Sequence, residues 1–90
     1  MKTIQCLVSG KVQGVWFRAW TADQAKNLNI KGWVRNLEDG KVEVLAQGED
    51  KDLEEFKKRL LTGSPLSRVE KVECKQIEYD KTYEHFEIRG

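Results

Sequence analysis

The spacing of apolar residues alternates between two patterns along this chain of 90 residues, and no other feature constrains the fold as strongly. Some segments place an apolar residue at every second position, which is typical of half-buried β-strands. Others repeat apolar residues at intervals of three or four, which indicates helices with one buried side. In chain order the predicted elements are a strand at 3–9, a helix at 18–28, strands at 32–37 and 41–47, a helix that begins at Asp50, a strand at 69–79 and a short strand around Phe86 and Ile88.

This order predicts an α+β fold with two helices on one face of a mainly antiparallel sheet. The length suits one domain, so we expect residues 1–90 to form a single domain. We expect Asp50 to cap the second helix, and the Gly-Ser-Pro sequence at 63–65 to end it. The apolar phase of the next strand shifts between Val69 and Val72, which indicates a β-bulge.

The connection between the first strand and the first helix contains glycines and ends in an arginine. Its sequence is Gly10-Lys11-Val12-Gln13-Gly14-Val15-Trp16-Phe17-Arg18. Backbone N–H groups at a strand-to-helix turn favour an anion, and an arginine there adds a planar set of donors for phosphate or carboxylate. A tight turn followed by a surface arginine is the alternative interpretation. The segment is neither a Walker A loop nor a dinucleotide-binding fingerprint, because it lacks the Lys-Ser/Thr pair of the former and the third glycine of the latter.

A second segment, residues 32–43, has the pattern of a strand, a turn and a strand, with Asp39-Gly40 as the turn dipeptide. Together the two segments resemble the signatures of the acylphosphatase family. The matching positions are Gly10, Val12, Gln13, Gly14, Val15, Phe17 and Arg18 in the first segment, and Gly32, Trp33, Val34 and Asn36 in the second. The resemblance covers nearly the whole chain and implies a ferredoxin-like βαββαβ plait with a short fifth strand.

The resemblance also implies an activity, which is hydrolysis of the carboxyl–phosphate bond of acyl phosphates to a carboxylate and inorganic phosphate. Arg18 would clamp the phosphate, and Asn36 would hold the attacking water, for which a neutral amide offers both a donor and an acceptor. A role in the turn is the alternative for Asn36. The backbone amides expected to bind the phosphate are those of Gly14, Val15, Trp16, Phe17 and Arg18.

No other pattern in the chain suggests a nucleophile or a metal. The position six residues before Arg18 is Val12 rather than a cysteine, which disfavours a cysteinyl-phosphate intermediate. Asp50 and Asp52 open a helix, where acidic residues are common without any catalytic role. The single histidine, His85, has no catalytic partner close to it in the sequence, so we expect it to be structural or exposed. We expect no metal and no cofactor.

The charge composition points away from nucleic acid and membranes as partners. Sixteen basic and fifteen acidic residues give a formal charge of +1, which provides little attraction for either. No apolar run approaches the roughly 20 residues that span a bilayer, and the N-terminus shows no signal-peptide pattern. We therefore expect a cytoplasmic protein. The resemblance implies small-molecule acyl phosphates as its partners, and a monomer is the default expectation. Cys6 and Cys74 lie in strand-like runs and are expected to be buried free thiols.

Other functions are compatible with the same order of elements. A non-catalytic ferredoxin-like module could bind RNA or a phosphoprotein. RNA-recognition domains, however, stack bases on aromatic residues of central strands, whereas Trp16, Phe17 and Trp20 cluster at a loop and a helix start. The chain could also be a module of a larger protein that processes carbamoyl phosphate, or a weak enzyme with a stress or regulatory role. Two positions depart from the family pattern. Trp16 stands where many relatives have a small residue, and Leu37 stands where some have threonine. These differences leave the rate and the substrate preference open.

Overall fold

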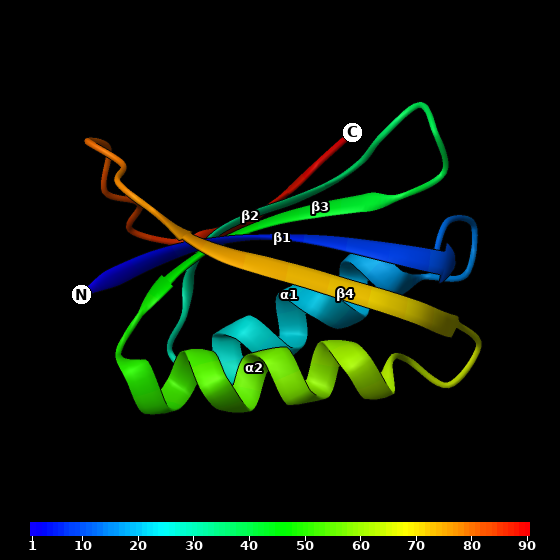
Figure 1. The fold of residues 1–90 in the computed structure, drawn as a ribbon, viewed down its shortest axis with the longest axis horizontal. Coiled ribbons are helices and arrows are strands. Elements are labelled where there is room, and N and C mark those ends of the chain that lie inside the picture. Colours follow the sequence, from blue (N-terminus) through cyan, green and yellow to red (C-terminus); the bar gives the residue numbers. More distant parts are fainter.

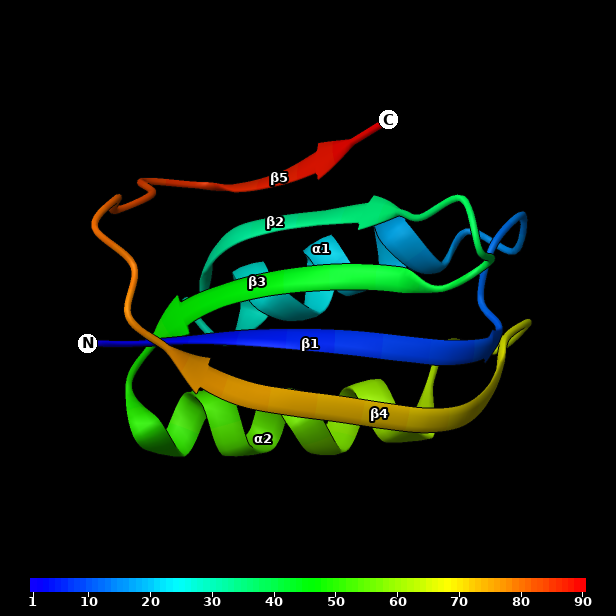
Figure 2. The ribbon, with the colours of Figure 1, turned by 45° about the horizontal axis from the view of Figure 1, so that its top comes forward.

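The computed structural model describes residues 1–90 and contains the predicted elements in the predicted order. They are β1 (Lys2–Lys11), α1 (Phe17–Asn27), β2 (Lys31–Asn36), β3 (Val42–Gly48), α2 (Asp50–Thr62), β4 (Arg68–Ile77) and β5 (Phe86–Arg89). The strands form one sheet in the order β4-β1-β3-β2-β5, in which only β2 and β5 run parallel. Both helices lie on one side of this sheet (Figure 1), and Figure 2 shows the strands in front of them. The predicted plait with a short fifth strand is confirmed.

The main core fills the space between the sheet and the helices. Alternate residues of β1 and β3, such as Val8 and Val44, face the helices, as their spacing in the sequence predicts. The buried residues of α2 are spaced three or four apart and are Leu53, Phe56 and Leu60. Burying one side chain of this size contributes about 1.5–3 kcal/mol, so this packing holds the helices in place and with them the loops that precede them. Neither helix is long and apolar enough to cross a membrane.

The pairing of β1 with β4 confirms the predicted bulge. Ser9 lies opposite Lys71 and Gly10 lies opposite Val69, so β4 contains one extra residue at this point. Gly10 has a φ of +124°, and a Cβ at this position would overlap the carbonyl oxygen of Arg68. Only glycine tolerates both conditions, so the first glycine of the loop segment serves the packing of β1 against β4.

Asp50 does not cap α2, so this prediction was wrong. Glu49 occupies the N-cap position without a side-chain hydrogen bond to the helix, and Asp50 is already helical. The Oδ1 atom of Asp50 instead pairs with Nζ of Lys2 at 2.9 Å. Asp50 and Asp52 both lie in the first turn, where a negative charge suits the positive end of the helix dipole.

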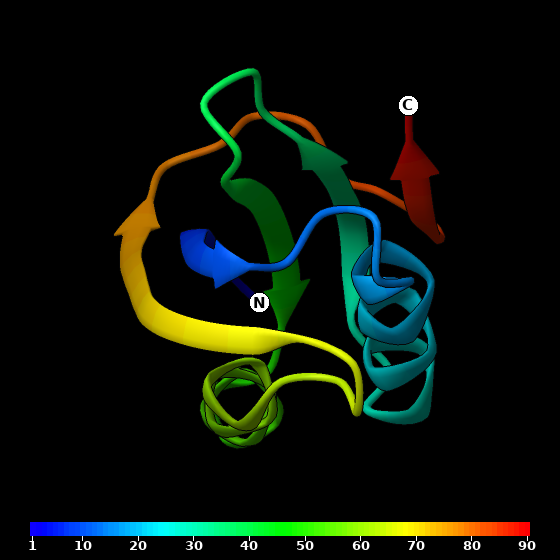
Figure 3. The ribbon, with the colours of Figure 1, turned by 90° about the vertical axis from the view of Figure 1, so that its right-hand side faces the viewer.

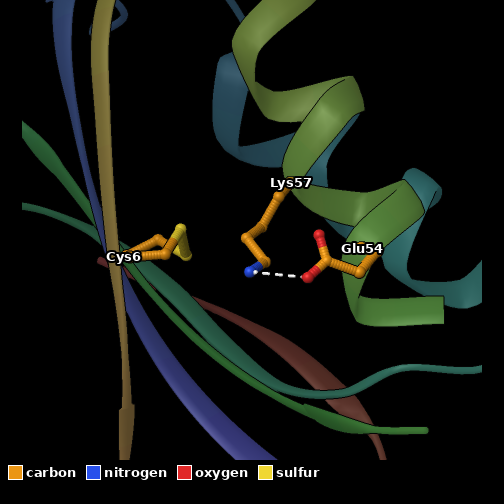
Figure 4. Close-up of a disulfide and its surroundings, with 4 residues drawn as sticks. Cys6, Glu54 and Lys57 are labelled. Atoms are coloured by element: carbon orange, nitrogen blue, oxygen red, sulfur yellow. Dashed lines mark ion pairs between the residues drawn. A yellow bond between two sulfur atoms is a disulfide. The ribbon is translucent and has the colours of Figure 1, made fainter. Parts of the chain in front are cut away.

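Cys6 and Cys74 form a disulfide, so the prediction of free thiols was wrong. The two residues lie directly opposite each other in the antiparallel pairing of β1 with β4, with a Cα–Cα distance of 4.0 Å. Because 68 positions separate them in the sequence, only the pairing of these strands reveals that they meet. The disulfide lies on the helix side of the sheet beside α2, where Lys57 Nζ and Glu54 Oε1 form an ion pair at 3.1 Å (Figure 4).

A smaller apolar cluster covers part of the opposite face of the sheet. Trp33 of β2 and Leu45 of β3 pack against Tyr83, which belongs to the segment between β4 and β5. Trp33 Nε1 donates a hydrogen bond to the Tyr83 hydroxyl at 3.1 Å, and the Arg89 guanidinium lies 4.8 Å from the centre of the Trp33 ring. A cation over an aromatic face contributes about 0.5–1 kcal/mol at an exposed site. These contacts hold β5 against β2, and the end of β5 borders the site described next.

Candidate active site

Three segments that are far apart in the sequence meet at one end of the sheet. They are the loop between β1 and α1, the end of β2 with its following turn, and the C-terminal part of β5 (Figure 2), and Figure 3 views the molecule from this end. A pocket of about 430 Å³ opens between them. Its lining residues are Val12, Gly14, Trp16, Phe17, Arg18, Ala19, Asn36 and Ile88.

The pocket thus contains Arg18 and Asn36, the two side chains that the sequence singles out, although 18 positions separate them. Gly14, Trp16 and Phe17 of the predicted phosphate loop line it as well. The side chain of Val15 does not line the pocket but packs against the main core, so only its backbone is available for a ligand.

The loop between β1 and α1 owes its shape to two residues with left-handed backbone. Gly14 has a φ of 71°, and Trp16 has a φ of 64° and a ψ of 19°. Glycine adopts such angles freely, whereas a residue with a Cβ is destabilised there by roughly 1–2 kcal/mol. Strained backbone of this kind is common at ligand-binding sites, and here it lies in the wall of the pocket.

The backbone amides that follow are free of internal partners. None of the hydrogen bonds made in turns, loops and helix caps has its donor among the amides of residues 14–18. The first N–H groups of a helix have no partner within it and carry the positive end of its dipole. In α1 no side chain caps these groups, and the first turn contains no acidic residue. The start of α2, by contrast, contains Asp50 and Asp52.

Arg18 adds a cation at the same place. Its side chain is half-buried, and its Nη1 donates a hydrogen bond to the Arg89 carbonyl oxygen at 2.7 Å. No carboxylate lies within ion-pair distance of its guanidinium. A guanidinium has five N–H donors, so the bond to β5 orients Arg18 and leaves most of its donors for an anion.

Asn36 is the last residue of β2, and its Oδ1 atom is buried without a hydrogen-bond partner in the protein. A buried polar atom left unpaired costs about 1–3 kcal/mol. Three side chains have such an atom, and Asn36 is the one among them that lines the pocket. The following turn does not use the Asn36 side chain. It is closed by Leu37 N–H donating to the Lys41 carbonyl at 2.8 Å and by Lys41 N–H donating to Asp39 Oδ1 at 3.0 Å. The second of these bonds lowers the pKa of Asp39.

Two further residues of the site were assigned no role from the sequence, although Gln13 belongs to the matching segment 10–18. The Nε2 atom of Gln13 donates to the carbonyl oxygens of Leu37 and Lys41 at 2.8 and 2.9 Å, and so ties the phosphate loop to the turn after Asn36. Ile88 of β5 forms part of the pocket wall. The match of Gln13 to the resembled signature was the signal available, whereas its hydrogen-bond partners lie 24 and 28 positions away and have no local pattern.

The other candidates from the sequence lie outside the pocket. His85 is exposed at the residue before β5, in agreement with the expected structural or exposed role. Asp50 and Asp52 belong to the first turn of α2 and do not line the pocket. No group of three or more His, Cys, Asp or Glu side chains is arranged to hold a metal ion.

The molecule is a small α+β domain, a ferredoxin-like plait whose pocket combines free amides at a helix start, an arginine without an ion pair and an asparagine side chain, a set of groups suited to an oxyanion. The family model described as acylphosphatase matches residues 4–88, and the chain belongs to this family. It is 46% identical over 86 residues to an acylphosphatase from Nitrosococcus oceani, covering 96% of both chains, and 44% identical over 88 residues to one from Archaeoglobus fulgidus, covering 98% of both. The crystal structure of acylphosphatase from Bacillus subtilis superposes with a TM-score of 0.95 at 33% identity, over 100% of both chains.

Proposed function

We propose that this chain hydrolyses the carboxyl–phosphate bond of acyl phosphates and releases a carboxylate and inorganic phosphate. The observation that carries the proposal is the pocket that Arg18 and Asn36 line together, beside a loop whose amides at residues 14–18 have no partner in the protein. No cysteine, serine or histidine lines this pocket. The substrate must therefore contain a bond that water cleaves once it is positioned. A mixed anhydride has such a bond, because its carboxylate leaving group is stable without protonation.

In the proposed mechanism Arg18 and the loop amides bind the terminal phosphoryl oxygens. Phosphoryl transfer depends mainly on positioning and on stabilisation of charge at these oxygens. The donors are fixed before the substrate arrives, because Gly14 and Trp16 set the backbone of the loop and the Arg89 carbonyl orients Arg18. Donors that need no reorganisation stabilise a transition state more than mobile ones.

Asn36 lines the pocket and holds the attacking water in this mechanism through its side-chain amide. The water oxygen forms a new bond to phosphorus, and the bond from phosphorus to the acyl oxygen breaks with its electron pair leaving on the carboxylate. Both protons of the water end on the phosphate product, so no protein base is required. A carboxylate in place of the amide would repel the phosphoryl oxygens.

Hydrolysis of benzoyl phosphate in ¹⁸O-labelled water, with and without a chelator, tests this proposal. We expect the label to appear in inorganic phosphate and the rate to survive chelation. Label in the benzoate would place the attack at the carbonyl carbon. A rate that disappears with chelator and returns with added magnesium would overturn the metal-free mechanism.

The proposal has small-molecule acyl phosphates as partners and no nucleic acid. The absence of nucleic acid from this proposal is supported by the face of the sheet opposite the helices. An RNA-binding domain of this topology would present exposed aromatic side chains on that face for base stacking. Here Trp33 and Tyr83 are only 6% and 9% exposed. A salt-dependent shift of RNA at micromolar protein, together with an absence of acyl phosphate hydrolysis, would favour the binding module instead.

We further propose that residues 1–90 act as one domain and as a monomer. The main core draws on both helices and on strands from both halves of the chain. The large exposed apolar side chains outside the pocket come from four different segments of the chain, and they are Met1, Leu61, Leu66 and Tyr79. Light scattering during gel filtration tests this point, and a mass of twice 10.5 kDa would contradict it.

The cytoplasmic location expected from the sequence is also part of the proposal. Reducing systems keep most cysteine pairs as thiols in that compartment, so Cys6 and Cys74 would be reduced there. The redox state of the two cysteines in the cell tests this location. Cells are quenched with acid, free thiols are alkylated, and the protein is analysed by mass spectrometry. Two alkylated cysteines agree with the cytoplasm, whereas an intact Cys6–Cys74 bond points to an oxidising compartment.

A further inference from the structure

Trp16 is the most exposed large apolar side chain of the protein, with 79% of its surface accessible, although it lies in the wall of the pocket. The Trp16 indole has no aromatic or cationic partner. By contrast, Trp20 packs against Phe17, and two arginine guanidinium groups lie over the ring of Trp33. The face of the Trp16 ring is therefore free. The left-handed backbone of Trp16 destabilises the folded state, and because the side chain is exposed, its burial does not compensate for this cost.

A second apolar side chain in the same wall comes from another element. Ile88 of β5 is 51% exposed, and it lines the pocket together with Trp16, Arg18 and Asn36. The pocket of about 430 Å³ is within the range of sites that hold whole organic ligands. It therefore offers room beyond what a phosphate group occupies.

We propose that Trp16 and Ile88 form an acyl-binding subsite that selects acyl phosphates with aromatic or large apolar acyl groups. This inference rests on the proposed function, which places the phosphate against the amides of residues 14–18. The acyl carbon is joined to phosphorus through a single bridging oxygen, so the acyl group of a phosphate bound there lies in or at the mouth of the same pocket, which Trp16 lines. No carboxylate lines the pocket, so a neutral apolar acyl group meets no unpaired charge except that of Arg18.

Stable phosphonates separate this inference from the proposed function, because methylphosphonate and benzylphosphonate share the PO3 group and differ only in the apolar part. Calorimetric titration of the wild-type protein should show tighter binding of benzylphosphonate. A favourable aromatic pair corresponds to about two- to twelvefold in affinity. Equal affinities would overturn the subsite while leaving the anion site intact. If neither phosphonate nor inorganic phosphate binds, both the subsite and the proposed function are wrong.

Variants then assign the preference to the two side chains. Trp16→Gly retains the left-handed backbone without strain, and Trp16→Phe retains an aromatic ring. We expect the ratio of kcat/KM for benzoyl phosphate to that for acetyl phosphate to fall by about two- to twelvefold in Trp16→Gly and to be largely restored in Trp16→Phe. Ile88→Ser, which changes a different element, should lower the same ratio.

Leu61→Ala is the matched control, because Leu61 is equally apolar and 60% exposed but lies on α2 away from the pocket. It should leave the ratio unchanged. An unchanged ratio in both Trp16→Gly and Ile88→Ser, or an equal fall in Leu61→Ala, would overturn the assignment.

Discussion

One hydrogen bond and the lack of an ion pair together define the role proposed for Arg18. One N–H of its guanidinium is bound to the Arg89 carbonyl, and no acidic side chain neutralises its charge. A surface ion pair would be worth only about 0–1 kcal/mol, whereas a fixed donor at a transition state is worth about 2.7–4 kcal/mol. We predict that Arg18→Ala lowers kcat/KM for benzoyl phosphate by about a hundred- to a thousandfold and weakens inhibition by phosphate. Wild-type kinetics in a folded Arg18→Ala variant would remove Arg18 from the site.

Asn36 differs from Arg18 in which kinetic constant it should control. Because its side-chain amide is assigned to the water rather than to the phosphate, Asn36→Ala should lower kcat by about a hundredfold or more. The inhibition constant of inorganic phosphate should stay close to that of the wild-type protein. A variant that loses phosphate affinity and turnover to the same extent would instead place Asn36 among the phosphate ligands.

At the scale of elements, the two helices begin with opposite charge patterns, and the difference is a direct test of the anion site. The third helical residue is Ala19 in α1 and Asp52 in α2. An acid at this position usually stabilises a helix, so Ala19→Asp should not unfold the protein. It should weaken phosphate binding by at least about tenfold, because it adds a like charge to the pocket that Ala19 lines.

Asp52→Ala provides the matching control at the start of α2. It should lower thermal stability slightly, because it removes a favourable charge from the helix terminus, and leave phosphate binding unchanged. An equal loss of phosphate affinity in Asp52→Ala, or none in Ala19→Asp, would show that the anion does not bind at the start of α1.

At the scale of the whole molecule, the disulfide joins two strands whose cysteines are separated by 68 positions. In the chain-entropy model, closing a loop of this length in the unfolded chain stabilises the folded state by about 4 kcal/mol. We predict that a reducing agent lowers the free energy of unfolding in urea by about 2–4 kcal/mol. The Cys74→Ala variant should not respond to the reductant. Identical unfolding of the oxidised and reduced wild-type protein would contradict this role.

Most of the fold was predictable because its signals are local. The two-residue spacing of Val42, Val44 and Ala46 and the helical spacing of Leu53 and Phe56 identify the residues that face the main core, and the structure agrees. The alternation did not show that β3 is buried on its other face as well. Local charge did not predict the cap of α2, because Asp50 contacts Lys2 of another element instead of the helix.

The site was predictable in part. Arg18 and Asn36 stand in recognisable motifs, and the fold places both in one pocket. The bonds that hold them depend on contacts between distant segments, such as Gln13 with the turn after β2 and Arg18 with the Arg89 carbonyl. The disulfide between Cys6 and Cys74 also depends on distant segments, because only the strand register brings the two residues together. No local pattern encodes these pairings, so they required the structure.

A crystal soaked in inorganic phosphate tests the central claim most directly. The anion should lie at the start of α1, within hydrogen-bond distance of the amides of residues 14–18 and of the Arg18 guanidinium, with the Asn36 side chain beside it. Phosphate bound at another surface while this pocket holds none would contradict the account.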